Sequence, residues 1–129
     1  DRVVNAQYVP NALEFIKHSY GNYKLFISTG TPTTEMKNIL KLKKIIGYFT
    51  SVYGSPALKN EHVSVICTQY NLKSDELLFF GDSITDLKAA AEYRIKFILR
   101  LHEHNKKYFH NYSGQKINNF KSLKISSII

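Results

Sequence analysis

Two carboxylates four residues apart stand out in the segment 81–86, GDSITD. The segment follows the apolar run 77–80, so Asp82 stands where a strand would end and Asp86 one turn into the next element. Clustered carboxylates suit Mg²⁺, which usually takes one or two protein carboxylates and fills its other positions with water and phosphate oxygens. A plainer alternative is that Ser83 or Asp86 only caps the next helix. We expect Asp82 and Asp86 to be metal ligands.

A second polar cluster, formed by Ser28, Thr29 and Gly30, follows the apolar run 24–27. A hydroxyl and backbone N–H groups at the end of a strand, ahead of a helix, can bind a phosphate or another oxyanion. The alternative is an ordinary turn between a strand and a helix. We take these three residues as candidate phosphate-binding residues.

Lys59 is the third candidate, and it follows the turn residues 54–56, GSP, near the start of a predicted helix. A lysine at this place can hold a fixed positive charge against a phosphate or neutralise crowded carboxylates. In isolation it would be interpreted as a surface lysine. Its assignment therefore depends on the other two clusters.

These candidates must be positioned by the surrounding elements, and the sequence alternates short apolar strands with helical segments. The predicted strands are 24–27, 48–53, 77–80 and 95–99, and the predicted helices are 11–20, 33–42, 58–70 and 86–93. Thr33 or Thr34 is expected to cap the second helix. Such alternation predicts an α/β fold with a parallel sheet covered on both faces. Ligands of such sheets bind at the carboxyl ends of the strands, where all three clusters fall.

Together, the three segments resemble motifs of the haloacid dehalogenase superfamily. The stretches KLFISTG (24–30), YGSP (53–56) with Lys59, and FFGDSITDLKAA (79–90) are similar to its second, third and fourth motifs, in the same order. The spacing is similar to phosphoglycolate-phosphatase-like members, and the resemblance runs from about Pro10 to Arg100. It implies a Rossmann-like three-layer α/β/α core and an enzyme that hydrolyses a small phosphomonoester through a phospho-aspartate with Mg²⁺. Dehalogenase and phosphomutase chemistry within the superfamily stay open.

The resemblance also implies a role for each candidate residue. Ser28 would hydrogen-bond a phosphoryl oxygen, with help from the N–H of Thr29. Lys59 would neutralise the phospho-aspartate and hold the nucleophile in place. Asp82 would bind Mg²⁺ directly or through water, and Asp86 would support the metal shell. Phosphoryl transfer depends on such positioning and charge neutralisation.

The family's first motif, Asp-x-Asp at the end of an apolar strand, is absent from this sequence. Asp1 does not replace it, because no strand precedes it and Val3 stands where the second aspartate would be. Asp75 precedes a strand instead of following one. We therefore expect residues 1–129 to be a single, N-terminally truncated core domain without the first, central strand and without a cap. Such a chain would lack its nucleophile and be inactive alone.

In the family, the missing strand lies between the strands that end here at Ser28 and Gly81. Exposed strand edges invite pairing with another segment. We expect the missing N-terminal segment, or a second copy of this chain, to fill the sheet. Residues 102–129 are less regular, and we expect a small strand followed by a weak helix or tail.

Two other classes of function compete with the phosphatase. One is a non-catalytic binding or assembly module that keeps the phosphate-binding residues. The other is a phosphate-receiver domain, in which the acidic pair comes early and the lysine late. Here Lys59 precedes Asp82, which argues against the receiver domain.

The overall composition restricts the partners and the location. The 129 residues carry a formal charge of +8, from 18 Lys and Arg against 10 Asp and Glu. The lysines are scattered and no nucleic-acid-binding motif accompanies them, so no nucleic-acid partner is expected. No apolar run approaches the roughly 20 residues that span a bilayer. The single cysteine, Cys67, excludes an internal disulfide, so a cytoplasmic protein is expected.

One weaker signal is the segment 102–104, His-Glu-His. On a strand it would place two imidazoles on one face, as in some metal sites. No third ligand is evident in the sequence. We therefore expect an exposed polar loop.

Overall fold

The structure is a computed structural model, and it describes residues 12–118 and residue 120. The expectations for Asp1, Val3 and the C-terminal tail therefore lie outside the described residues. The chain divides into two compact units, the first formed by residues 1–58 and 119–129 and the second by 59–118.

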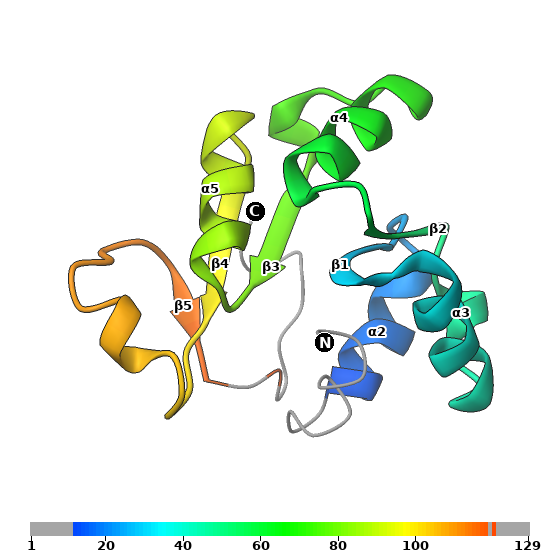
Figure 1. Cartoon of the computed structure of the whole chain (residues 1–129), viewed down its shortest axis with the longest axis horizontal. Helices are drawn as coiled ribbons and strands as arrows, with labels where there is room; N and C mark the ends of the chain where they lie inside the picture. The colour runs from blue at the N-terminus through cyan, green and yellow to red at the C-terminus, as the bar shows by residue number, and fades with distance from the viewer. Residues whose placement is uncertain (1–11, 119, 121–129) are drawn as a thin grey trace. The chain divides into compact units, whose positions relative to one another are not determined.

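The first unit is built on two parallel strands. Its elements are α2 (Ala12–Tyr20), β1 (Phe26–Pro32), α3 (Thr33–Leu42), a 3-10 turn (Ile46–Tyr48) and β2 (Ser51–Ser55) (Figure 1). In the ladder between β1 and β2, Ile27 lies opposite Val52 and Ser28 opposite Tyr53. A buried apolar cluster joins the strands to α3, and it consists of Ile27, Met36, Leu40, Ile45 and Val52.

Two strands of this unit differ from the prediction in their bounds. β1 continues to Pro32, so the polar cluster 28–30 lies within a strand and not in a turn. The strand can continue because Thr29, like Ile27, points into the interior and is only 2% exposed. β2 begins at Ser51 and not at residue 48, because the preceding aromatic segment closes a 3-10 turn in which the N–H of Phe49 donates to the carbonyl of Ile46 at 3.1 Å.

The expected cap of α3 by Thr33 or Thr34 is wrong. The N-cap residue is Pro32, and no side chain caps the helix. The hydroxyl of Thr33 instead accepts a hydrogen bond from the N–H of Gly54 at 2.9 Å. Thr33 therefore links the start of α3 to the end of β2.

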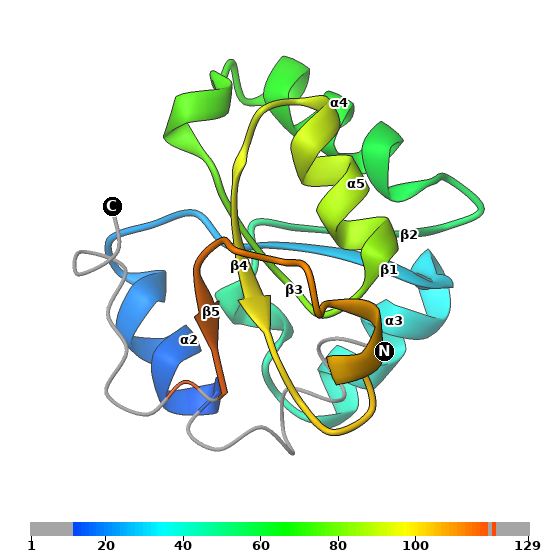
Figure 2. The same cartoon turned by 90° about the vertical axis from the view of Figure 1, so that its left-hand side faces the viewer.

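The second unit contains a three-stranded parallel sheet in the order β3-β4-β5. Its elements are α4 (Lys59–Gln69), a 3-10 turn (Ser74–Glu76), β3 (Leu78–Gly81), α5 (Ile84–Glu92), β4 (Lys96–Arg100), a 3-10 turn (Lys106–Tyr108) and β5 (Lys116–Ile117). Figure 2 shows the three strands running side by side. Gly81 lies opposite Leu99, so β3 and β4 end at the same edge of the sheet.

Helix α5 packs on this sheet through small side chains. Ala89 and Ala90 are 3% and 0% exposed, which lets the helix approach the strands closely (Figure 1). The core of the unit is a buried cluster of Val63, Ala90, Ile95, Phe97, Leu99 and Phe109. The predicted α/β class with parallel strands is confirmed. Within the described ranges, none of the helices combines the length and apolar character that crossing a bilayer demands.

Candidate functional site

The turn between β3 and α5 is organised by one buried carboxylate. The Oδ2 atom of Asp86 accepts hydrogen bonds from the N–H groups of Asp82 and Ser83, both at 3.1 Å. The hydroxyl of Ser83 accepts in return from the N–H of Asp86 at 3.1 Å. Ser83 is thus the N-cap of α5 in a reciprocal capping box. The capping alternative is confirmed for Ser83.

Gly81 leaves room for this carboxylate. A Cβ atom at position 81 would lie 2.6 Å from the Cβ of Asp86 and 2.8 Å from its Oδ2. Real Cβ atoms essentially never come so close to other heavy atoms. The glycine in the segment 81–86 is therefore required by the burial of Asp86.

Lys59 is held by the same buried carboxylate. Its Nζ lies 2.9 Å from the Oδ1 of Asp86, and the Lys59 and Asp86 side chains are 14% and 0% exposed. Lys59 is the first residue of α4, so this ion pair joins the start of α4 to the start of α5. A charge removed from water needs such a partner. The structure thus brings two of the candidate residues together.

The Asp82 carboxylate lies at the end of β3 and remains open to solvent. Its side chain is 31% exposed, and its Oδ2 lies 3.6 Å from the Nε2 of His102. Asp82 therefore differs from Asp86, whose two oxygens face Lys59 and the backbone of the turn. Of the two predicted metal ligands, Asp82 is the one with an accessible carboxylate.

The segment 102–104 is only partly the exposed loop that we expected. Glu103 and His104 are exposed, but His102 is half-buried and faces Asp82. The N–H of His104 donates to the Nδ1 of His102 at 3.1 Å, which leaves Nε2 directed toward the carboxylate. His102 is therefore a neighbour of the candidate site that the sequence pattern did not assign to it.

Asn105 is a second residue that sequence reasoning missed. It is 5% exposed, and its Nδ2 donates to the carbonyl oxygens of Asp82 and Arg100, both at 2.9 Å. Its Oδ1 accepts from the N–H of His102 at 2.7 Å. No spacing pattern signals such a residue, because its partners are main-chain groups.

The donor set fits Mg²⁺ in part. Across the described ranges, no three His, Cys, Asp or Glu side chains gather into a metal-binding group. Mg²⁺ needs fewer protein ligands, because it keeps several waters and binds substrate phosphate. The accessible carboxylate of Asp82 suits such a site, and Asp86 would support it through the turn and Lys59.

The phosphate-binding candidates of the first unit lie on β1. Ser28 is half-buried, Thr29 is buried, and Gly30 is exposed with open space around its Cβ position. The hydroxyl of Thr29 accepts from the N–H of Thr31 at 3.2 Å, so this side chain stabilises its own strand. Lys59, which belongs to the second unit, was expected to meet these residues. That meeting stays a prediction.

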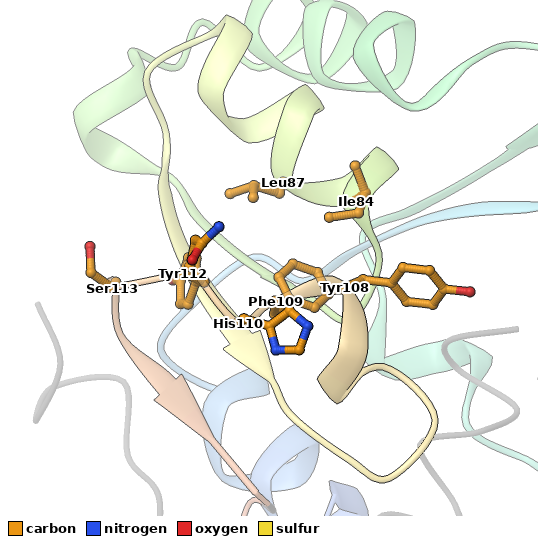
Figure 3. A pocket seen from close by; sticks show the side chains of 9 residues that line it. Ile84, Leu87, Tyr108, Phe109, His110, Tyr112 and Ser113 are labelled. Atoms are coloured by element: carbon orange, nitrogen blue, oxygen red, sulfur yellow. The ribbon is translucent and has the colours of Figure 1, made fainter.

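A pocket of about 440 Å³ lies beside the candidate site and contains none of its residues. Figure 3 shows Ile84 and Leu87 of α5 facing the loop that carries Phe109 and Tyr112. The hydroxyl of Tyr112 donates to the carbonyl of Gln115 at 2.8 Å, and burial raises the pKa of this phenol. The pocket is mainly apolar, and no carboxylate lines it.

Several solved structures share this fold. A haloacid dehalogenase-like family hydrolase from Streptococcus pneumoniae matches with a TM-score of 0.75 at 20% identity, covering 84% of this chain and 53% of that chain. The core domain of a proposed phosphoglycolate phosphatase from Streptococcus pneumoniae TIGR4 matches with a TM-score of 0.71 at 23% identity, covering 92% and 85%. A predicted phosphoglycolate phosphatase from Haemophilus somnus matches with a TM-score of 0.66 at 25% identity, covering 70% and 43%.

The extent of these matches differs between whole relatives and core domains. This chain spans about half the length of the first of these hydrolases and most of the isolated core domain. A search of curated proteins gives no match. Residues 3–100 match the sequence profile of the haloacid dehalogenase-like hydrolases, and the fold agrees. The chain therefore belongs to the haloacid dehalogenase-like hydrolase family.

Proposed function

We propose that this chain is the core of a Mg²⁺-dependent phosphatase that hydrolyses a small phosphomonoester through a phospho-aspartate. The observation that carries the proposal is the ion pair between Lys59 and Asp86, at 2.9 Å, next to the accessible carboxylate of Asp82. The ammonium of Lys59 is thus held by the turn that also carries the accessible carboxylate of Asp82, which would bind the metal ion. Phosphoryl transfer requires such positioned charges.

Each candidate residue has a role in this proposal. Asp82 would hold Mg²⁺, which when bound neutralises negative charge on the phosphoryl oxygens. Lys59, kept in place by Asp86, would hold its ammonium against the phosphoryl group and the attacking carboxylate. The hydroxyl of Ser28 and the N–H of Thr29, with Gly30 beside them, would bind the remaining phosphoryl oxygens.

The nucleophile comes, in this proposal, from outside these 129 residues. The sequence has no Asp-x-Asp after an apolar strand. β1 pairs with β2, and β3 pairs with β4. In the family that the sequence resembles, a central strand lies between the strands that correspond to β1 and β3. We propose that an N-terminal segment of the same protein, or a second copy of this chain, supplies that strand, and that the enzyme works in the cytoplasm.

Assays of phosphate release with p-nitrophenyl phosphate and phosphoglycolate test the proposal. Phosphoglycolate is included because two of the matched structures are described as phosphoglycolate phosphatases. We expect no turnover by the 129-residue chain alone. A longer polypeptide with an Asp-x-Asp strand ahead of residue 1 should turn over with Mg²⁺, and Asp82→Asn should reduce its rate about a hundredfold or more.

The matched control is Asp75→Asn, which removes an exposed aspartate from the same unit and should leave the rate unchanged. Turnover by the 129-residue chain alone that disappears in Asp82→Asn would refute the missing nucleophile. The absence of Asp-x-Asp also favours a second candidate, a non-catalytic module that binds phosphate. That candidate predicts no turnover by the longer polypeptide.

A further inference from the structure

The amide side chain of Asn105 is buried at the point where β3 and β4 end. It uses two donors and one acceptor: Nδ2 donates to the carbonyls of Asp82 and Arg100 at 2.9 Å, and Oδ1 accepts from the N–H of His102 at 2.7 Å. All three partners are main-chain groups. A buried polar side chain with satisfied hydrogen bonds fixes local geometry, because breaking any bond leaves a buried group unpaired.

Asn105 links the ends of β3 and β4 one residue beyond their last ladder pair. The last ladder pair between these strands is Gly81 with Leu99, and the next residues along the chain are Asp82 and Arg100. By donating to both of their carbonyls, Asn105 keeps the two chains together beyond the end of the ladder. The exit of the chain from β3 is therefore fixed by a side chain 23 residues further on.

Asp82 is consequently held on both of its main-chain polar groups. Its N–H donates to the Oδ2 of Asp86, and its carbonyl accepts from Asn105. Its side chain remains 31% exposed. A fixed main chain with an accessible carboxylate is the geometry expected of a preorganised ligand.

We propose that Asn105 is a positioning residue that orients the Asp82 carboxylate for Mg²⁺; this inference rests on the proposed function. Asn is suited to the place because it offers two N–H donors and one acceptor in one short side chain. Asp would place an oxygen against two carbonyl oxygens, and Ser could donate to one carbonyl only. Residues that orient a metal ligand typically change metal affinity 10–100-fold when they are replaced.

The test is a Mg²⁺ titration of the 129-residue chain, followed by the amide ¹H–¹⁵N NMR shifts of Gly81, Asp82 and Ser83. We expect Asp82→Asn to abolish the Mg²⁺-dependent shifts. We expect Asn105→Asp to weaken Mg²⁺ binding about tenfold or more, and Asn105→Ser to weaken it less. If Asn105→Asp does not fold, Asn105→Ser still decides the outcome.

The control variant is Tyr112→Phe. It removes a hydroxyl that also bonds main-chain carbonyls in the same unit, those of Phe97 and Gln115. Urea unfolding of each variant gives the loss of stability for comparison. Equal Mg²⁺ affinity in the Asn105 variants and the wild type, or equal weakening in Tyr112→Phe, would overturn the positioning role while Asp82 remains the ligand. A wild-type chain that shows no Asp82-dependent shifts would overturn the metal site and this inference with it.

Discussion

At the residue scale, the buried carboxylate of Asp86 restricts which residues can stand at positions 59 and 81. It accepts two N–H groups of the turn and lies 2.9 Å from the ammonium of Lys59. The same carboxylate fills the space where a side chain at position 81 would be. The identity of Gly81 therefore follows from packing, whereas Lys59 satisfies a buried charge.

We predict that Gly81→Ala destabilises the chain by about 1–3 kcal/mol, because its Cβ would overlap Asp86, which cannot move without losing its partners. Chemical denaturation followed by circular dichroism measures the change. The matched control is Gly30→Ala, because a Cβ at Gly30 meets nothing within 4 Å. The control should stay within about 0.5 kcal/mol of the wild type. Similar losses in both variants would contradict the packing argument.

The sequence pointed to Lys59, Asp82 and Asp86 as candidates because their three segments occur together, and the structure brings Lys59 and Asp86 into contact. The sequence did not reveal the contacts of Asn105 or Thr33. Each of these two forms hydrogen bonds with main-chain groups more than 20 positions away. Main-chain groups are the same at every position, so the sequence holds no signal for such contacts.

At the scale of elements, the junction between β3 and α5 depends on the cap of the helix. Helix α5 begins at Ile84, two residues before the predicted start at 86, because Ser83 caps it. The predicted strand 77–80 differs by only one residue from the observed β3, Leu78–Gly81. Periodicity locates the middle of an element, but side-chain hydrogen bonds set its ends.

We predict that Ser83→Ala destabilises the second unit by about 1 kcal/mol, since the N–H of Asp86 loses its acceptor at 3.1 Å. The free energy of unfolding in urea measures the loss. Ser83→Thr keeps a capping hydroxyl and should restore most of the stability. An alanine variant as stable as the wild type would show that the cap contributes nothing to α5.

At the scale of the whole molecule, the family match runs from residue 3 to residue 100 and includes parts of both compact units. The strand-and-helix alternation was readable from the sequence because buried parallel strands are short, continuous apolar runs. The division into two units could not be predicted from the sequence, because no change in composition marks the boundary at residue 58. Contacts between distant segments decide such divisions.

The net charge of +8 gives a prediction for the complete chain. Scattered lysines produce only weak, salt-dependent attraction to nucleic acid, so we expect no saturable binding of a labelled DNA duplex below about 10 μM at physiological salt. Fluorescence anisotropy measures this binding, with the same titration at low salt as the control. Tight binding that persists as the salt concentration rises would contradict the interpretation of a solvated basic surface.

The shared dependence of positions 59, 81 and 86 has a consequence for how this protein can evolve. Replacing Asp86 alone would leave the ammonium of Lys59, whose side chain is only 14% exposed, without its buried counter-charge. As long as Asp86 remains, its carboxylate also blocks any larger residue at position 81. Single substitutions at Asp86 or Gly81 therefore pass through destabilised intermediates. In diverging lineages, these three positions should either persist unchanged or be exchanged as a set.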